Sequence, residues 1–277
     1  MTFDFWPKSK RLAFYGCGNM GSAMLEGWLK AGLEPSSVCL LIQNPEKHQR
    51  FANLGVHVVN KSTDLPAQLD VLILAVKPQI MPQIMTDADR IASKNTLVIS
   101  VAAGLNSNWY AHYLKSKQIL RVMPNTPCAQ RQGVNGLYAN FALNTQQRAM
   151  VDGLFGLLGA NVWLEREEQM HELTAISGCG PAYVYYFVEA LSLAAQKLGF
   201  DEQQSLLLAK NTVLGAAALM EHSDLDPSIL RQHVTSAKGV THAGLVQLME
   251  QKQGLSPLLQ RVTQAAVARS RALEAEG

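Results

Sequence analysis

The sequence lacks any strong excess of charge. Its 24 Lys and Arg nearly balance its 22 Asp and Glu, which leaves a formal net charge of +2, and charged residues make up only 17% of the chain. A nucleic-acid or anionic-membrane partner would require a basic stripe, and none is present. Hydrophobic residues make up 48% of the 277 residues, which is typical of well-buried globular domains. We therefore expect no nucleic acid and no membrane among its partners.

Paired cysteines and long apolar runs are also missing. The four cysteines form no C-x-x-C pair, and no histidine lies near them at metal-ligand spacing, so we expect reduced thiols and no metal site. The longest strongly apolar run, Val71 to Val76, is far too short to span a bilayer. Met1 to Lys10 lacks the continuous apolar core of a signal peptide. These absences predict a cytoplasmic protein.

The first half of the chain alternates short β-rich runs with helical stretches such as Gly21–Ala31 and Pro45–Asn53. This alternation is typical of βαβ units on a parallel sheet. Several of the predicted strands are apolar throughout, as strands covered on both faces should be. The predicted strands are Leu12–Tyr15, Val38–Ile42, Val56–Val59, Val71–Ala75, Leu97–Val101 and Ile119–Val122, with Gly136–Ala139 and Asn161–Trp163 extending the sheet at its edge.

After about Glu165 the sequence predicts helices alone. Pro181–Leu198 is apolar on nearly every face, which indicates burial inside a bundle or an oligomer interface. Glu202–His222 is a second long helix, with Asp201 placed to cap its N-terminus. Two further helices begin where an N-cap residue is followed by proline, at Asp226-Pro227 and Ser256-Pro257.

A glycine-rich turn connects the first predicted strand to the first predicted helix. Its spacing is G-x-G-x-x-G, with Gly16 for the tight turn, Gly18 for close approach to a pyrophosphate, and Gly21 for helix–strand packing. The phosphates would face the helix N-terminus, whose N–H groups and dipole favour anions. Such a turn can also be purely structural, but its strand–turn–helix context favours a dinucleotide. The candidate contacts are Gly16, Cys17, Gly18, Asn19 and Met20.

The end of the second predicted strand bears on the choice of cofactor. An NAD site usually has an acid there for the ribose 2′-hydroxyl, whereas this chain has Gln43 and Asn44. Lys47, His48 and Arg50 follow, so neutral or cationic donors could meet a 2′-phosphate. NADPH is favoured, and NADH is the alternative. Lys47 and Arg50 are otherwise a solvated helix face.

Four further segments follow the glycine-rich turn in order: Ala75–Gln79, Arg121–Pro127, Ser177–Tyr183 and Val234–Thr241. Together with the turn they resemble the Δ1-pyrroline-5-carboxylate reductase family, from Arg11 to about Arg271. That family reduces a cyclic imine to proline with NAD(P)H, the last step of proline synthesis. The chain is therefore expected to be an α/β protein. A Rossmann-type, doubly wound parallel sheet is expected in residues 1–165, and an all-helical substrate and dimerisation domain in residues 166–277.

The resemblance also implies cofactor contacts beyond the turn. The A-V-K-P segment after the fourth strand lines the cofactor in the family, although it could otherwise be a strand-ending turn with an exposed lysine. Met123–Pro127 either walls the nicotinamide half of the crevice or is a stiff connector. Small residues in Ser177–Gly180 either turn N–H groups towards an anion or allow close packing. The implied cofactor contacts are Ala75, Val76, Lys77 and Pro78, with weaker support for Asn60, Val101, Ala102 and Ala103.

The Val234–Thr241 segment carries the substrate chemistry in family terms. The matching loop binds the substrate carboxylate, here through Ser236, Gly239 and Val240, and its threonine, Thr241, contacts the ring nitrogen. A threonine is a poor acid, so we expect Thr241 to position the imine before it donates any proton. His233 immediately precedes this loop. Without the resemblance the segment would be interpreted as a capping loop.

Four positions depart from the family pattern, one of them Ala237, which replaces a proline. Cys179 replaces a serine, which weakens hydrogen bonding, and His233 replaces a common asparagine. Lys238 replaces a glycine; if that position takes a positive φ, the lysine is strained by roughly 1 kcal/mol or more. These changes leave open two other functions, reduction of a cyclic imine acid of another ring size and cofactor-dependent regulation without catalysis.

The resemblance also implies an oligomer. Family members form dimers through interleaved helical domains, often arranged into a decamer, with the active site shared between one chain's cofactor domain and the partner's threonine loop.

Overall fold

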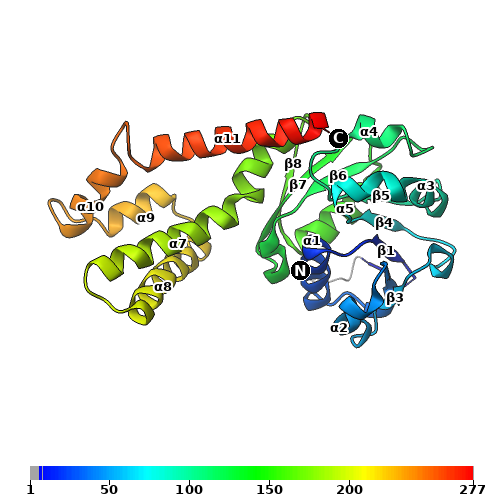
Figure 1. Ribbon diagram of the computed structural model, residues 1–277, viewed down its shortest axis with the longest axis horizontal. Coiled ribbons are helices and arrows are strands. Elements are labelled where there is room, and N and C mark those ends of the chain that lie inside the picture. The colour runs from blue at the N-terminus through cyan, green and yellow to red at the C-terminus, as the bar shows by residue number, and fades with distance from the viewer. Residues whose placement is uncertain (1–5, 8, 277) are drawn as a thin grey trace. The chain divides into compact units, whose positions relative to one another are not determined.

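The computed structural model describes residues 6, 7 and 9–276. The chain divides into two compact units, which we call the sheet unit (Met1–Gly178 with Ala266–Gly277) and the helical unit (Cys179–Ala265). Figure 1 shows the elements of both. In chain order they are β1 Leu12–Tyr15, α1 Asn19–Lys30, η2 Pro35–Ser37, β2 Val38–Leu41, η3 Pro45–His48, α2 Gln49–Ala52, β3 His57–Val59, η4 Ser62–Asp64, β4 Val71–Leu74, η5 Pro78–Ile80, α3 Met81–Ile91, β5 Leu97–Ser100, α4 Ser107–Ala111, β6 Leu120–Met123, η6 Thr126–Gln130, β7 Gly133–Ala139, α5 Thr145–Gly156, β8 Gly159–Trp163, α6 Gln169–Leu173, the π-helix η7 Thr174–Gly178, α7 Gly180–Lys197, α8 Glu202–Glu221, α9 Pro227–His233, α10 Val240–Leu248 and α11 Leu255–Glu276.

The sheet has eight strands in the order β3-β2-β1-β4-β5-β6-β7-β8. β1 to β6 run parallel, β7 pairs antiparallel with β6, and β8 pairs parallel with β7. The order reverses direction at β1, from which one half of the sheet runs to β3 and the other starts at β4. This reversal is the switch point at which doubly wound sheets bind ligands. The doubly wound sheet predicted from the sequence is confirmed, including its two edge strands.

Each face of the sheet is covered by helices, because the buried strands are apolar on both sides. On one face Leu12 and Phe14 pack with residues of α1 and α5, among them the fully buried Trp28. On the other face Ala13 packs with residues of α3 and with Tyr110 of α4. Figure 1 shows these helices on both sides of the strands. The sheet unit therefore closes a two-sided core.

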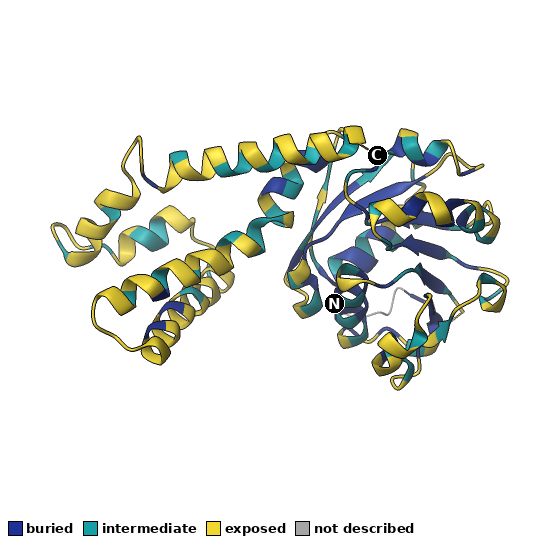
Figure 2. Ribbon diagram, in the orientation of Figure 1, coloured by how far each residue is buried: buried dark blue, intermediate teal, exposed yellow. Residues whose placement is uncertain are grey.

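The helical unit contains helices alone among its described residues, as predicted. Asp201 caps α8 with its side chain, which accepts from the Gln204 N–H at 2.7 Å. Asp226 caps α9 in the same way, ahead of Pro227. The prediction of a cap at Ser256 was wrong, since α11 begins at Leu255 and Ser256 is already helical. Figure 2 shows how much of this unit's helical surface is exposed.

Two local predictions differ from the structure. The stretch Pro45–Asn53 is not one helix but a 3-10 turn, η3, followed by the single-turn α2. The backbone leaves helical geometry between them at His48, with φ −119° and ψ 16°. The second difference is at Cys179, which precedes α7 and has helical dihedral angles of its own, φ −86° and ψ −23°. The backbone is thus already helical before α7, in η7 and at Cys179. The N–H groups of this segment lie within a helical stretch and do not follow an extended loop.

Candidate functional site

The predicted cofactor residues meet along one edge of the sheet. Strand pairing aligns Tyr15 with Leu41 and Leu74, so the residues after β1, β2 and β4 follow one another across the edge. The chains leaving these strands stay bonded, as where the Ala75 N–H donates to the Tyr15 carbonyl at 2.9 Å. Leu74 in turn aligns with Ser100, which brings the segment after β5 to the same edge. The carboxyl ends of parallel strands are where open α/β sheets hold ligands.

The glycine-rich turn has the geometry that a pyrophosphate requires. Gly16 has φ +80°, and a Cβ there would lie 2.4 Å from Cγ1 of Val76, so only glycine fits. A Cβ on Gly18 would meet nothing within 4 Å, which leaves open space at the start of α1. Gly21 packs closely, with a Cβ position 3.4 Å from Cβ of Ala75. Since the first N–H groups of α1 lack intrahelical acceptors, the turn fits a dinucleotide.

Cys17 lies within this turn and is buried. Burial raises the pKa of its thiol to about 11, despite a contact between Sγ and the Ser22 hydroxyl at 3.6 Å. At neutral pH the thiol is therefore protonated and a poor nucleophile. Cys17 serves the turn through its backbone and its packing.

Gln43 and Asn44, the residues just after β2, carry no carboxylate, whereas η3 carries Glu46 beside Lys47. Gln43, Asn44, Glu46 and Lys47 are all exposed. Arg50 is exposed too, but its Nη2 pairs with Oε1 of Glu26 on α1 at 2.5 Å. The structure thus presents two neutral side chains directly after β2, where a 2′-phosphate is expected, followed by an acid and a cation in η3, and it engages Arg50 elsewhere.

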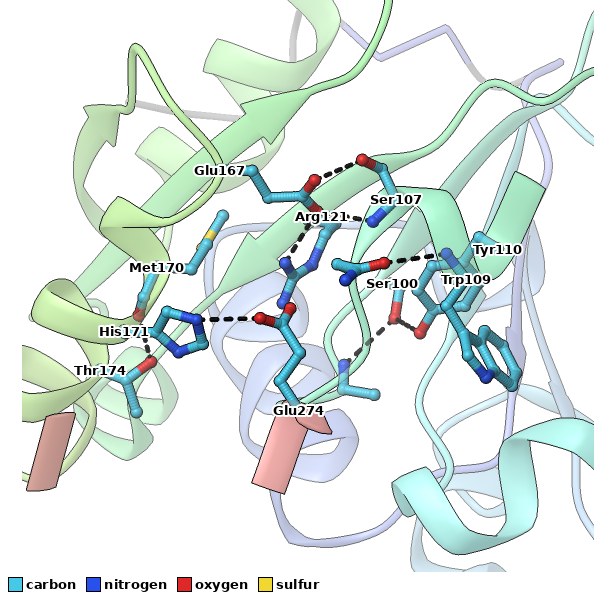
Figure 3. Close-up of polar contacts among 12 residues, drawn as sticks. Ser100, Ser107, Trp109, Tyr110, Arg121, Glu167, Met170, His171, Thr174 and Glu274 are labelled. Atoms are coloured by element: carbon cyan, nitrogen blue, oxygen red, sulfur yellow. Dashed lines mark hydrogen bonds and ion pairs between the residues drawn. The ribbon is translucent and has the colours of Figure 1, made fainter. Parts of the chain in front are cut away.

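The segment Val101–Ala103 is held by buried polar groups, shown in Figure 3. The Ser100 hydroxyl accepts from the Ala102 N–H at 3.2 Å and lies 2.5 Å from the Tyr110 hydroxyl. Burial raises the pKa of Tyr110 to about 12, so the phenol stays neutral. Ser100 and Tyr110 were not among the residues predicted from the sequence. A serine at the end of the apolar strand Leu97–Ser100 was an available signal for a buried hydrogen bond at this position.

A buried ion pair fixes the far end of the same connection. Arg121 of β6 is only 4% exposed, and its Nη1 lies 2.8 Å from Oε1 of Glu167. Glu167 also accepts from the Ser107 N–H at 2.7 Å, at the start of α4. Both bonds are drawn in Figure 3. The β5–α4 connection is thus tied at Ser100 and at Ser107, which stiffens the predicted cofactor segment between them.

Asn125, in the rigid segment after β6, is buried and uses its side chain structurally. Its Nδ2 donates to the Ser177 carbonyl at 3.0 Å, and its Oδ1 accepts from the Val134 N–H at 2.8 Å. These bonds support the reading of Met123–Pro127 as a stiff connector. Thr126 beside it is exposed.

The predicted substrate residues gather on one loop of the helical unit. His233 ends α9, Gly239 precedes α10, and Thr241 is its second residue. The Gly239 N–H donates to the Ser236 carbonyl at 3.0 Å, and a Cβ on Gly239 would lie 2.1 Å from the Ser236 Oγ. The first backbone bond of α10 is from Ala243 to Gly239 at 3.1 Å, so the N–H groups of Val240, Thr241 and His242 lack an intrahelical acceptor.

Lys238 takes the left-handed conformation in this loop, with φ +59°. The strain that the sequence analysis attached to a positive φ therefore applies, at roughly 1 kcal/mol. Lys238, Thr241 and His233 are all exposed within the helical unit.

The described residues were compared with the requirements of a metal site and of a membrane-spanning helix. In residues 6, 7 and 9–276, no three His, Cys, Asp or Glu side chains gather as a metal site would need. No helix in the same part of the chain has the length and apolar character to cross a membrane.

Two family models match the chain. Residues 167–273 match one described as pyrroline-5-carboxylate reductase dimerisation, and residues 11–104 match one described as NADP oxidoreductase, coenzyme F420-dependent. The pyrroline-5-carboxylate reductase of Pasteurella multocida is 36% identical over 273 residues, covering 96% of this chain and 98% of that protein.

Solved structures of pyrroline-5-carboxylate reductases are also similar to this chain over almost its full length. A pyrroline-5-carboxylate reductase from Coxiella burnetii is 32% identical with a TM-score of 0.88, over 96% of this chain and 99% of that one. The Plasmodium falciparum pyrroline carboxylate reductase, solved with NADP bound, is 28% identical with a TM-score of 0.81 over the same shares. With both family segments, the sheet order and the strand-edge site in agreement, the chain belongs to the pyrroline-5-carboxylate reductase family.

Proposed function

We propose that the chain reduces 1-pyrroline-5-carboxylate to L-proline with hydride from NADPH, the last step of proline biosynthesis. The observation that carries this is the open glycine turn beside a β2 end where Gln43 and Asn44 replace the acid of an NAD site, on a chain that matches such reductases over almost its full length. The Plasmodium relative solved with NADP supports the choice of cofactor.

The cofactor residues have distinct tasks in this proposal. The turn from Gly16 to Met20 binds the pyrophosphate, and Gln43 and Asn44 meet the adenosine end, with Asn60 nearby. Ala75–Pro78 and Val101–Ala103 line the cofactor towards its nicotinamide, whose reduced ring supplies the hydride. The chain contributes orientation and electrostatics to this transfer.

The loop before α10 holds the substrate in this proposal. Ser236, Gly239 and Val240 form the carboxylate site: the Ser236 hydroxyl and the N–H groups that start α10 donate, as a helix start can without an arginine, and Gly239 closes the turn between them. The Thr241 hydroxyl bonds the ring nitrogen and so positions the imine carbon for hydride. That carbon gains the hydride, and the nitrogen gains a proton from solvent. His233 lies at the edge of this loop and shapes its entrance.

Thr241 gives the direct test. We expect Thr241→Ala to lower kcat/KM for the imine acid about 10- to 100-fold, because one positioned hydrogen bond is lost. Thr241→Ser should keep most of the activity. Thr235→Ala is a matched control, since the Thr235 hydroxyl bonds the Arg231 carbonyl at 2.6 Å instead. Turnover would be measured by NADPH oxidation and proline formation, and an undiminished Thr241→Ala enzyme would refute the assigned role.

The same assay separates the alternatives. Faster turnover of a six-membered cyclic imine acid would indicate a reductase for another ring size, the alternative that the departures at Cys179 and Lys238 leave open. NADPH binding without turnover of either ring would indicate a regulator.

We also propose a homodimer formed through the helical units, with the partner's Thr241 loop completing each active site, and assembly of such dimers into a decamer. The match of residues 167–273 to a dimerisation family supports the dimer.

We also propose a cytoplasmic location, which rests on the short apolar runs and unpaired cysteines of the sequence.

A further inference from the structure

His48 contacts the phosphate-binding turn from the other side of the β2 edge. Its Nε2 lies 2.6 Å from the carbonyl oxygen of Cys17, 31 residues earlier in the chain. A carbonyl oxygen can only accept, so Nε2 carries the proton and donates. His48 ends η3, and the bond therefore joins the β2–α2 connection to the turn.

This bond orients the peptide between Cys17 and Gly18. The peptide is trans, so its C=O and N–H point in opposite directions. With the carbonyl held by His48, the Gly18 N–H points away from the imidazole. Among the described residues this N–H meets no backbone acceptor, and a Cβ built on Gly18 would meet nothing within 4 Å. The donor is thus left for a ligand, and no side chain at Gly18 crowds its approach.

The imidazole is held in place for this one bond. It stacks on Phe51, with ring centroids 6.3 Å apart and planes 24° apart, and Phe51 is only 1% exposed. The other ring nitrogen, Nδ1, is buried and has no hydrogen-bond partner within the described chain. A buried unsatisfied nitrogen costs stability, so the placement of the ring is explained better by Cys17 than by the ring's own contacts.

We propose that His48 is a positioning residue for the dinucleotide, which fixes the Cys17–Gly18 peptide with its N–H ready for the pyrophosphate. The proposal rests on the proposed function, in that the turn binds NADPH. Fixing a donor before binding removes an ordering cost that the ligand would otherwise meet. The pyrophosphate is common to NADPH and NADH, so His48 should strengthen both equally and leave their ratio unchanged. A residue that touched the 2′-phosphate would change NADPH alone.

The decisive variant is His48→Phe, which can keep the stacking on Phe51 and removes the donor. We expect the dissociation constants of NADPH and NADH each to rise about tenfold, the size of one lost hydrogen bond. They would be measured by fluorescence titration and by the cofactor-induced rise in melting temperature. We expect kcat to stay within about twofold and the KM of the imine acid to stay unchanged. His48→Gln should recover most of the affinity, because its Nε2 amide can donate from a similar place.

The control is Gln49→Ala, which removes an exposed hydrogen bond of the same segment, from the Gln49 Nε2 to the Asn53 Oδ1 at 2.9 Å, and leaves His48 and Phe51 in place. It should leave both dissociation constants unchanged. Equal weakening by His48→Phe and Gln49→Ala, unchanged affinity in His48→Phe, or a loss confined to NADPH would each overturn the proposal. If His48→Phe does not fold, His48→Met against His48→Gln makes the same comparison. The titrations need no turnover, so a wild-type chain that binds NADPH without reducing the imine would refute the proposed function and still test His48.

Discussion

The sheet unit and the helical unit cover their apolar side chains in different ways. Both hydrophobic core clusters consist of sheet-unit residues, and strands such as β4 are buried along their whole length. In the helical unit, Tyr186 is 70% exposed and Leu193 60% exposed on α7. Figure 2 shows this contrast in burial. Exposed apolar surface on this scale marks an interaction site, so the sheet unit completes its own core while the helical unit requires another surface.

The largest expected effect comes from charging the exposed face of α7. Tyr186 and Leu193 are seven residues apart and so lie on one side of the helix. Replacing both with Glu should weaken self-association at least about 100-fold, since buried interface anchors each contribute 2 kcal/mol or more. Analytical ultracentrifugation would show a shift to monomer. Leu54→Glu is the matched control in the sheet unit, where Leu54 is 59% exposed, and should leave the assembly intact. An unchanged oligomer in the double variant would mean that this face is not the interface.

The next effect concerns two glycines of the same turn in the sheet unit. Gly16→Ala places a Cβ 2.4 Å from Val76 and forces alanine to φ +80°, so it should weaken NADPH binding about 100-fold and lower the melting temperature of the free protein. Gly18→Ala meets nothing within 4 Å, so the free protein should melt as the wild type does while its NADPH affinity still falls. Differential scanning calorimetry with and without NADPH measures both quantities. A destabilised Gly18→Ala protein would contradict the open space beside that residue.

A smaller effect concerns the acid stability of the sheet unit, through Asp87 of α3. Burial acts to raise the pKa of Asp87, but hydrogen bonds from Arg90, Ser62 and Tyr15 outweigh it and lower the pKa below 3.8. The ionised carboxylate therefore stabilises the fold above pH 3.8, and this contribution is lost as the pH falls through the lowered pKa. Asp87→Asn should cost about 1 kcal/mol at neutral pH.

That cost should shrink in acid, which denaturant unfolding at neutral pH and near pH 3 would measure. Asp64→Asn is the control, because Asp64 is exposed and its carboxylate accepts from the neighbouring Thr63 hydroxyl at 3.2 Å. A cost for Asp87→Asn that grew in acid would have the wrong sign.

Local patterns were sufficient to predict much of the sheet unit. The apolar runs and turn signals predicted all eight strands within a few residues, most directly the inner strands such as β2 and β4, because strands covered on both faces have little freedom in composition. The spacing of Gly16, Gly18 and Gly21 predicted the turn, since Gly16 takes a positive φ, Gly18 leaves open space at the start of α1, and Gly21 packs against Ala75. By the same reasoning, capping residues such as Asp201 marked helix starts in the helical unit.

The features that the sequence did not predict are set by contacts between distant segments. The helix expected at Pro45–Asn53 is divided at His48, whose ring bonds Cys17, and no local periodicity indicates such a bond. The ties of Ser100 to Tyr110 and of Arg121 to Glu167 likewise depend on the packed fold. α11 was predicted as a helix, but its ion pair from Arg271 to Glu172, at 2.6 Å, could not be.

The smallest effect compares two left-handed lysines, one in each unit. Lys238 has φ +59° in the helical unit and Lys117 has φ +54° in the sheet unit, and both are exposed. Replacing either with glycine relieves backbone strain in the folded state but raises the conformational entropy of the unfolded chain. Because the two effects oppose each other, each change should alter the free energy of unfolding by only about 0.5 kcal/mol. Only Lys238 lies beside the proposed carboxylate loop. Lys238→Gly should therefore raise the KM of the imine acid about threefold at low salt and less at high salt, as the loss of one exposed cation predicts. Lys117→Gly should leave that KM unchanged.

A salt-independent rise in KM for Lys238→Gly would point instead to the altered backbone of the loop. Lys238→Gln separates the two causes, because it removes the charge and keeps a side chain at φ +59°.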